Sequence, residues 1–213
     1  MIRRDPWSVI GPRLPRLLIG LLLCGTGIAS MVVADLGLGP WDVFHQGVAK
    51  LTGVPIGTVG ILAGFVVLLG WLPLRERIGV GTICNVILIG VVIDVLLMVV
   101  TPPSSLVLRI VLMGIGPLLF GVGSGLYIGA GLGPGPRDGL MTGIAARGRP
   151  VWAVRLVMEL TVLALGAVLG GRVGLGTVLF AVGIGPIVHL ALRHLSVAPI
   201  DPADVGVTSV GAE

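Results

Sequence analysis

The tetrapeptide Gly37-Leu38-Gly39-Pro40 returns later in the chain as Gly131-Leu132-Gly133-Pro134, 94 residues further on. An acidic residue follows each copy closely, Asp42 in the first and Asp138 in the second. Glycine tolerates the positive φ of a sharp bend, whereas proline begins or ends helices and fits poorly inside them. Each copy therefore predicts a sharp turn followed by the start of a helix.

More of the surrounding sequence recurs in the same order and at nearly the same offset. Pairs separated by 94 to 96 residues are Gly20 and Gly114, Gly27 and Gly121, Gly47 and Gly143, Pro55 and Pro150, Gly90 and Gly185, and the Gly-x-Gly-Thr segments 79–82 and 174–177. The change of offset within this series is assigned to two additional residues, Gly135 and Pro136, in the second copy. An ordered series of matches at one offset indicates an internal duplication.

Six long apolar stretches carry this pattern, at residues 17–34, 54–74, 78–100, 110–130, 150–171 and 173–192. Each is close to the roughly 20 residues that a helix needs to cross a bilayer core of about 30 Å. Hydrophobic residues make up 55% of the 213 positions and charged residues 11%, where soluble domains carry roughly 25% charge. The sequence thus predicts an all-α integral membrane protein with about six transmembrane helices and the lipid bilayer as its partner.

The duplication divides this protein into two three-helix repeats, 14–100 and 110–195, joined by a linker at 101–109. Residues 1–13 are a basic N-terminal segment, and residues 196–213 predict a flexible tail because they contain three acids and two prolines. A secretory signal peptide is not expected at the N-terminus, since the apolar run is too long and lacks a small-x-small cleavage site.

The basic residues predict the orientation of the six spans. If the N-terminus is cytoplasmic, the outer side keeps only Lys50, Arg109 and Arg172 of the 14 lysines and arginines. An excess of these residues on the cytoplasmic side is the rule for multi-pass proteins, so both termini are expected to be cytoplasmic. Three spans per repeat turn the second repeat upside down relative to the first, an arrangement that recurs in secondary transporters.

Segments 42–51 and 138–147 follow the two turns and are too short to span a membrane. Asp42 and Asp138 are expected to cap these short helices. The helices either dip into the membrane as re-entrant elements or lie flat at its surface. Their polar residues slightly favour the surface: Asp42, His45, Gln46, Lys50, Arg137, Asp138, Thr142, Arg147 and Arg149.

Four ionisable residues within the apolar stretches are the candidates for binding a solute: Asp94, His189, Glu159 and Arg155. A charge in hydrocarbon costs roughly 2.5–3.5 kcal/mol even on permissive scales, so such residues generally face an interior or a partner. The repeat places His189 at the position that corresponds to Asp94, and both also lie near enough to a helix end to reach water. Arg155 and Glu159 are four residues apart and can form an ion pair near the membrane surface.

Several other classes of function are not expected. The basic residues lie at the ends of apolar stretches and form no patch with interleaved aromatic residues, which argues against nucleic acid as a partner. Cys24 and Cys84 lie in apolar stretches and are expected to act as small hydrophobic residues. No metal-binding motif, phosphate-binding loop or catalytic signature is present, so neither an enzyme nor a cofactor nor a metal site is predicted.

Longer strings resemble a known family. They are Gly37-Leu-Gly-Pro-Trp-Asp-Val-Phe-His-Gln-Gly47, Pro73-Leu-Arg-Glu-Arg77, Gly79-Val-Gly-Thr82 and Gly125-Leu-Tyr-Ile-Gly-Ala-Gly-Leu-Gly-Pro-Gly-Pro-Arg-Asp-Gly-Leu-Met-Thr-Gly143. Together they are similar to the YczE-type family of bacterial multi-pass membrane proteins over residues 14–193. The resemblance implies a bacterial cell (inner or plasma) membrane protein, and it transfers no substrate, reaction or binding residue to this chain.

Two classes of function stay open. The inverted repeat and the intramembrane ionisable residues favour a small secondary transporter or permease for a small molecule or ion. The scarcity of polar groups favours a membrane scaffold or regulatory subunit that serves a partner protein, and a homo-oligomer is compatible with either. A polar cavity that joins the two turn regions would distinguish the first class from the second.

Overall fold

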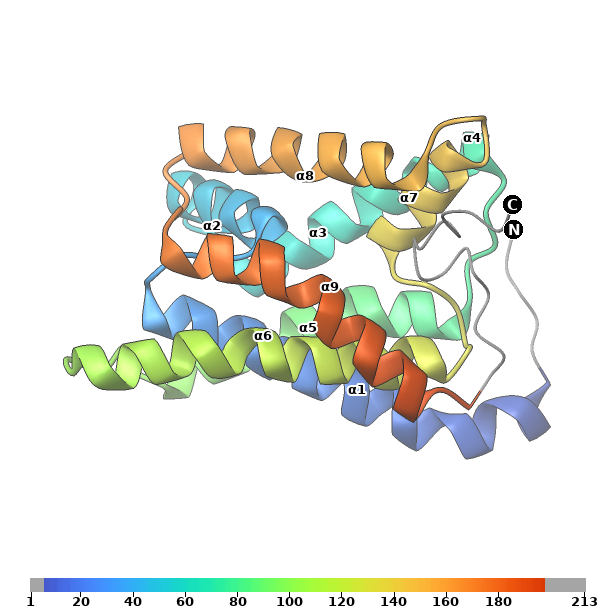
Figure 1. Cartoon of the computed structure of the whole chain (residues 1–213), viewed down its shortest axis with the longest axis horizontal. Helices are drawn as coiled ribbons and strands as arrows, with labels where there is room; N and C mark the ends of the chain where they lie inside the picture. The colour runs from blue at the N-terminus through green and yellow to red at the C-terminus, as the bar shows by residue number, and fades with distance from the viewer. Residues whose placement is uncertain (1–5, 198–213) are drawn as a thin grey trace, which may run out of the picture.

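The computed structural model describes residues 6–197, which form nine α helices (Figure 1). They are α1 (Trp7–Ala34), α2 (Pro40–Thr52), α3 (Ile56–Leu69), α4 (Trp71–Leu74), α5 (Val80–Val99), α6 (Leu106–Gly129), α7 (Pro136–Ala145), α8 (Val151–Val168) and α9 (Leu175–Leu195). Six segments are long and apolar enough to cross a membrane: α1, α3 together with α4, α5, α6, α8 and α9. The prediction of an all-α protein with six membrane spans is confirmed.

Two helices begin earlier than the apolar stretches suggest. The first starts at Trp7, within the predicted basic segment, and its extension is held by the buried Ile10 and by Arg13, whose Nη1 donates to the carbonyl oxygen of Ala130 at 3.2 Å. Helix α6 starts inside the predicted linker, where the Ser105 hydroxyl accepts a hydrogen bond from an amide of its first turn. The predicted tail falls almost entirely outside the described residues.

Helices α1 and α6 pack against each other along one side of the molecule, at the bottom of Figure 1, with their backbones in close contact. A Cβ atom added to Gly27 would lie 2.5 Å from the carbonyl oxygen of Gly116, and one added to Gly20 would lie 2.7 Å from that of Gly123. Small residues at such a crossing let membrane helices approach closely. Adding 96 to the residue numbers of α1 relates the two contacts to each other, because Gly20 then matches Gly116 and Gly27 matches Gly123. In the sequence match the same two glycines are paired with residues 94 positions further on.

The two turns have the same backbone conformation when residues 96 positions apart are compared. Gly37 and Gly133 take positive φ angles of 116° and 122°, which an L-residue with a side chain rarely adopts. A glycine then caps each short helix, and a proline stands at its first or second position. In backbone conformation the segment 37–40 therefore matches 133–136, so Gly135 and Pro136 form part of the second turn.

The prediction that aspartates cap the short helices is wrong. Helices α2 and α7 begin at Pro40 and Pro136, and their N-cap residues are glycines without a side-chain cap. Proline fits the first helical position because its fixed φ suits the helix and its missing amide hydrogen is not needed there. The helices consequently start two residues early, which places Asp42 and Asp138 inside the first turn with their carboxylates free for other contacts.

Each turn is fixed by a helix from the other half of the chain. The carbonyl oxygen of Leu36 accepts a hydrogen bond from Gly176 of α9 at 2.9 Å, and that of Leu132 accepts one from Gly81 of α5 at 2.8 Å. Both contacts require close backbone approach, since a Cβ atom on Gly174 would lie 2.5 Å from the Leu36 oxygen. This exchange of contacts between the halves sets the positions of α2 and α7.

Helices α2 and α7 start inside the bundle and run toward opposite ends of it (Figure 1). At the end of α2, Lys50 donates to the carbonyl oxygen of Gly170 at 2.9 Å, and beyond α7 Arg147 donates to that of Pro73 at 2.7 Å. Their inner faces are buried, and Gly139 of α7 leaves room for the indole of Trp71. The surface location favoured by their polarity is not what the structure shows, because glycine and apolar residues on one face of each helix pack against the spans.

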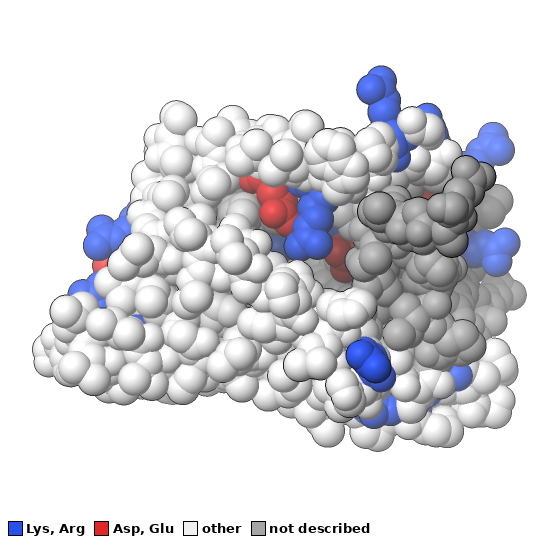
Figure 2. Space-filling model, in the orientation of Figure 1, with Lys and Arg blue, Asp and Glu red and all other residues white. Residues whose placement is uncertain are grey.

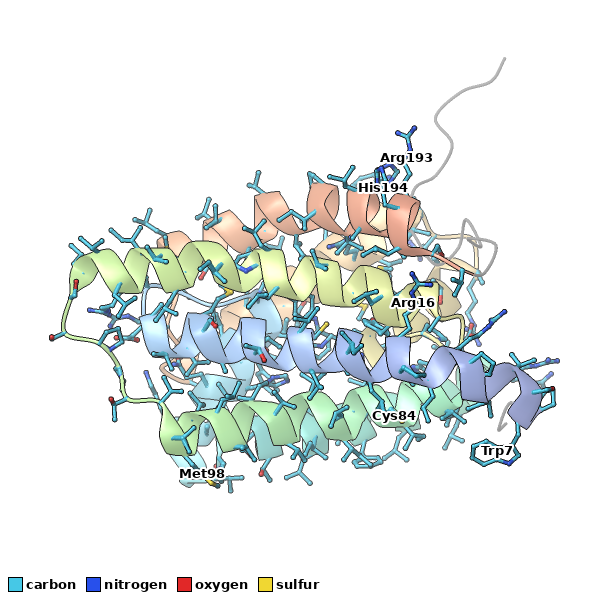
Figure 3. All side chains as sticks on the ribbon, turned by 90° about the horizontal axis from the view of Figure 1, so that it is seen from below. Trp7, Arg16, Cys84, Met98, Arg193 and His194 are labelled. Atoms are coloured by element: carbon cyan, nitrogen blue, oxygen red, sulfur yellow. The ribbon has the colours of Figure 1, made fainter. Side chains whose placement is uncertain are left out.

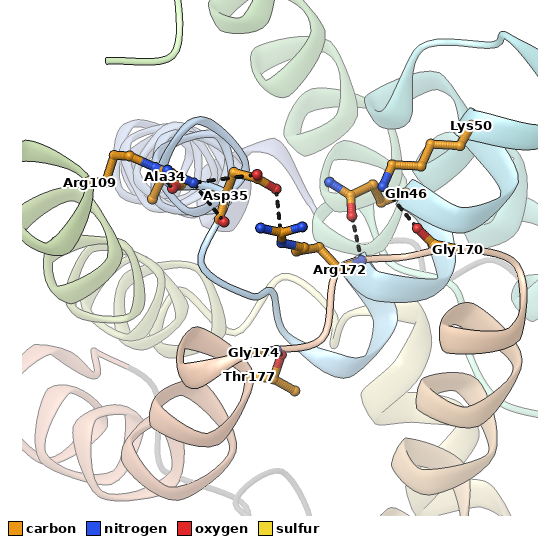
Figure 4. A network of polar contacts seen from close by, with 9 residues as sticks. All are labelled: Ala34, Asp35, Gln46, Lys50, Arg109, Gly170, Arg172, Gly174 and Thr177. Atoms are coloured by element: carbon orange, nitrogen blue, oxygen red, sulfur yellow. Dashed lines mark hydrogen bonds and ion pairs between the residues drawn. The ribbon is translucent and has the colours of Figure 1, made fainter. Parts of the chain in front are cut away.

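A network of polar contacts closes one end of the molecule (Figure 4). The Arg109 guanidinium donates to the carbonyl oxygen of Ala34 at 2.7 Å and contacts Asp35, which also faces Arg172 at 3.5 Å. The backbone amide of Arg172 donates to Gln46 at 2.7 Å. These contacts hold the loop between α8 and α9 against α1, α2 and α6.

The outer faces of the spans carry apolar side chains along their whole length (Figure 3). In this view Trp7, Arg193 and His194 lie toward one end of the molecule and Met98 toward the other. The exposed large apolar residues of α8 and α9 include Leu156, Val157, Leu160, Val178 and Val182. A protein with this surface requires a lipid environment.

Candidate functional site

A cavity of about 510 Å³ lies where the first turns of α2 and α7 meet. Both turns contribute to its wall, through Gly39 and Pro40 from the first and Gly135 and Pro136 from the second. The six spans complete the wall, with α1 contributing Ile28, so both halves of the chain build the site. A volume of this size suits a small molecule.

The cavity wall combines apolar surface with an unusual share of charge for so apolar a chain. Its charged residues are three acids and two arginines: Asp42, Asp138, Glu159, Arg137 and Arg155. The other polar residues of the wall are Trp41, His45, Asn85, Ser124, Tyr127 and His189. Of the four residues predicted to bind a solute, Arg155, Glu159 and His189 line this cavity.

Arg137 links the two short helices at the centre of the site. Its Nη2 lies 4.0 Å from Oδ1 of Asp42, and its Cζ lies 4.6 Å from the centre of the Trp41 ring. An arginine above an indole gains a cation–π attraction, which strengthens when water is excluded. The guanidinium of α7 is thus held by a carboxylate and an aromatic ring of α2.

The two aspartates of the short helices have different partners. The Asp42 carboxylate lies 3.5 Å from Nδ1 of His45, and both side chains are buried. The carboxylate of Asp138 accepts a hydrogen bond of 3.0 Å from the Tyr127 hydroxyl. Helices α2 and α7 are not among the six spans, and burial there lowers the pKa of His45 and raises the pKa of Asp138. His45 is therefore neutral at pH 7.

A second ion pair lies on α8 at the mouth of the cavity. Nε of Arg155 donates to the Glu159 carboxylate at 3.0 Å, and these side chains are 43% and 32% exposed. The pairing expected from their spacing is confirmed, and the structure adds that the pair faces the cavity. His189 of α9 also lines it and forms no hydrogen bond with a described residue.

Asp94 lies outside the cavity lining and holds α3 against α5. Its carboxylate accepts hydrogen bonds from the backbone amides of Gly57 and Thr58 at 2.6 and 2.7 Å, and from the Thr58 hydroxyl at 2.7 Å. It caps the start of α3 from a neighbouring helix, and negative charge at a helix N-terminus is stabilising. Close packing of Gly57 against Gly90 joins the same two helices.

The corresponding helices of the second half are arranged differently. Helices α8 and α9 leave their shared loop and diverge, whereas α3 and α5 pack together (Figure 1). Figure 2 shows acidic and basic side chains in a hollow between α8 and α9, surrounded by uncharged surface, while the other charged side chains in this view lie toward the two ends of the molecule. The site is thus closed between α3 and α5 and open between α8 and α9.

Replacing Asp94 with asparagine is expected to lower the free energy of unfolding by about 2 kcal/mol, because hydrogen bonds to a charged group contribute roughly 1.5–3 kcal/mol. Denaturant or thermal unfolding of the purified protein in detergent measures this change. His189→Gln is the matched control, since His189 lies at the same position of α9 without such bonds, and it should shift the free energy by less than about 0.5 kcal/mol. Equal shifts for the two variants would contradict the capping role of Asp94.

Most of the central residues were not identified from the sequence as binding residues. The sequence places His45 and Arg137 with the short helices and Tyr127 in an apolar stretch, and it gives Trp41 no separate role. Each stands within a few residues of a turn glycine, or eleven residues before Asp138 in the case of Tyr127. Each of these residues is therefore near one of the two turns in the sequence, and this nearness is the feature from which the site could have been predicted. Among the described residues there is no cluster of three or more His, Cys, Asp or Glu side chains able to hold a metal ion.

Comparisons with known proteins give family relationships. Residues 12–193 match the family described as "Family of unknown function (DUF6198)". The chain is 40% identical to an uncharacterized protein of Haemophilus influenzae over 92% of this chain and 90% of that one. It is 36% identical to the uncharacterized membrane protein YczE of Bacillus subtilis over 81% and 82% of the two chains. No solved structure matches the chain.

Proposed function

The chain belongs to the YczE-type membrane protein family, and from this premise we propose that it is a small secondary transporter built from two inverted repeats. The observation that carries the proposal is the charged cavity at the meeting point of α2 and α7. Transporters of this class bind their solutes where interrupted segments from two inverted repeats meet near the middle of the membrane.

In this proposal α1 to α5 form the first repeat and α6 to α9 the second. The reciprocal glycine contacts of α1 with α6 and the exchanged contacts of the two turns support a two-fold axis between the halves. Both termini lie in the cytoplasm of the bacterial cell. The closed network in Figure 4 then faces outward and contains Lys50, Arg109 and Arg172, the three basic residues assigned to that side.

The different packing of the two halves suggests how access alternates. The α3–α5 pair is closed by Asp94 and Gly57, while the equivalent α8–α9 pair is open. Exchange of these two packings between the halves would close the present opening and create one on the opposite side. Inverted repeats allow this exchange because each half can adopt the conformation of the other.

A non-transporting scaffold or regulatory subunit is the alternative. Such a protein needs apolar faces that bind a partner, and this role does not require an interior cavity lined by five charged groups. Buried charges cost free energy unless they are paired, yet a chain with only 11% charged residues places five of them around one cavity. This concentration favours a role in binding a solute.

The proposal is tested with the full chain in liposomes of phosphatidylethanolamine and phosphatidylglycerol. One set holds a pH-sensitive dye and receives amino acids, betaines or amines, and another contains fluorescent phospholipids whose movement is read by dithionite quenching. We expect the wild type to move at least one of these probes about tenfold faster than protein-free liposomes, and Asp138→Asn to lose this activity. Asp35→Asn, in the end network, should retain it. If no probe moves faster than in protein-free liposomes, the transporter is excluded and the scaffold becomes the better proposal.

A further inference from the structure

We infer that the cavity takes the headgroup of a zwitterionic amphiphile whose apolar tail stays in the bilayer between α8 and α9. This inference rests on the proposed function and names the substrate class for that same site. Three observations carry it: the direction in which the cavity opens, the pairing of its charges, and the apolar surface on both sides of the opening.

The cavity opens through the side of the bundle. The spans run roughly parallel to the long axis of the molecule, and Figures 1 and 2 look at a face formed by α6, α8 and α9. The hollow with its charged side chains lies on this face, between α8 and α9. In a membrane such a side faces lipid, so a molecule dissolved in the bilayer reaches the cavity without first entering water.

Four of the five charged residues of the cavity form two pairs of opposite sign, and the fifth, Asp138, accepts the hydrogen bond of the Tyr127 hydroxyl. Arg155 and Glu159 are bonded at the mouth, and Arg137 and Asp42 face each other deeper inside. A zwitterion can enter by exchanging partners, with its anion on Arg155 and its cation on Glu159, and both members of this pair keep a partner of opposite charge. An anion or a cation alone would break this pair and leave one member without a partner, which is unfavourable even though solvent screens the partly exposed Arg155 and Glu159.

The wall also offers hydrogen-bonding groups that the protein does not use. Asn85 lines the cavity and forms no hydrogen bond with any residue that the structure describes. Ser124 is buried in the wall, and its described contact is the weak one with the Cys24 sulfur at 3.8 Å. An amide and a hydroxyl can bind the ester and phosphate oxygens of a headgroup, since unpaired buried polar groups are otherwise costly.

The helices that border the opening present apolar surface to the tail. Met158 of α8 and Ile184 of α9 line the cavity, and Leu160 and Val182 are exposed on the same two helices. A polar interior that continues into an apolar lateral slot matches a molecule with a compact charged head and a long apolar tail. A soluble zwitterion would contact only the polar interior and would leave the apolar slot empty. A second copy of the chain would fill the slot but would supply no zwitterionic group to the paired charges.

The test is native mass spectrometry of the full chain in detergent with equal amounts of phosphatidylethanolamine and phosphatidylglycerol that carry the same acyl chains. The wild type should retain the zwitterionic lipid at least about fivefold over the anionic one. Glu159→Gln and Arg155→Gln should both bring this ratio near one, because each removes one partner of the zwitterion. Arg172→Gln, outside the cavity, should keep the wild-type ratio. A wild-type ratio near or below one would overturn the inference.

Two further experiments keep Arg155 and Glu159 unchanged, so their results do not depend on whether the Gln variants fold. Photoreactive benzoylphenylalanine at Met158 should crosslink phosphatidylethanolamine in mixed liposomes, while the same probe at Val157, on the lipid-facing side, should crosslink the two lipids in their bulk ratio. A crosslink from Met158 to a second copy of the chain would overturn the inference. Equal crosslinking of the two lipids from Met158 would also overturn it.

The lipid-retention and liposome experiments together distinguish failure of this inference from failure of the proposed function. Selective lipid retention without movement of any probe in liposomes would support the lipid site and remove transport. Movement of a soluble probe without selective lipid retention would support transport and remove the lipid site.

Discussion

Cysteines that replace Gly64 of α3 and Val86 of α5 are expected to form a disulfide readily, in a chain whose Cys24 and Cys84 are replaced by alanine. A Cβ atom on Gly64 would lie 3.6 Å from the Cβ of Val86, within the 3.5–4.5 Å range of natural disulfides. The equivalent residues of the second half are Glu159 of α8 and Ala181 of α9. Cysteines there should react at least about tenfold more slowly, because α8 and α9 diverge.

Oxidation with copper phenanthroline, followed by mass analysis at timed intervals, gives both rates. The slow pair reports the state in which α8 and α9 have closed, so its rate should rise when the α3–α5 contact is weakened by Asp94→Asn. Equal rates for the two pairs would contradict the asymmetry, and complete absence of reaction at the second pair would contradict alternation. In liposomes that move a probe, the disulfide between positions 64 and 86 should reduce transport to less than about 5%, and a reductant should restore it.

The sequence was sufficient to predict the six spans, because their length and apolarity depend on the bilayer and not on neighbouring helices. It also located both turns, since two closely spaced glycines followed by proline are typical of a bend that leads into a helix. It misplaced the register of the second turn by two residues. The letters Gly-Leu-Gly-Pro occur at 131–134, but the structure requires positive φ at Gly133 and proline at position 136.

The location of α2 and α7 could not be read from their composition. A helix with charged residues at a membrane surface and a helix whose charged residues face a polar cavity have similar sequences. The difference lies in contacts from elsewhere, such as the hydrogen bonds of Leu36 with Gly176 and of Leu132 with Gly81, which join residues far apart in the chain. The same reason separates Asp94 from His189: equal positions in the repeat do not imply equal environments when the two halves have different packing.

Replacing Arg137 with glutamine is expected to have the largest effect on stability of any single substitution in the cavity. Its side chain is 35% exposed and its guanidinium faces Asp42, whose side chain is 5% exposed. Removal of one member of a buried pair leaves the other without compensation, and the exposed fraction of Arg137 reduces the cost by solvent screening. We expect a loss of about 2 kcal/mol in the free energy of unfolding, measured by denaturant titration in detergent, together with a loss of transport of about 100-fold.

The double variant Asp42→Asn with Arg137→Gln separates these two effects. Because the unpaired carboxylate is gone, it should recover about 1 kcal/mol of stability relative to Arg137→Gln alone, as coupled neighbours do in double-mutant cycles. It should not recover transport, since the link between α2 and α7 and the positive charge at the centre of the cavity are both missing. Arg172→Gln is the control: this arginine is 52% exposed and lies 3.5 Å from Asp35 in the end network, so its loss should cost less than about 0.5 kcal/mol. Wild-type stability and transport in Arg137→Gln would remove the α2–α7 link from the mechanism and leave the pair of Arg155 with Glu159 as the charged element that contacts the solute.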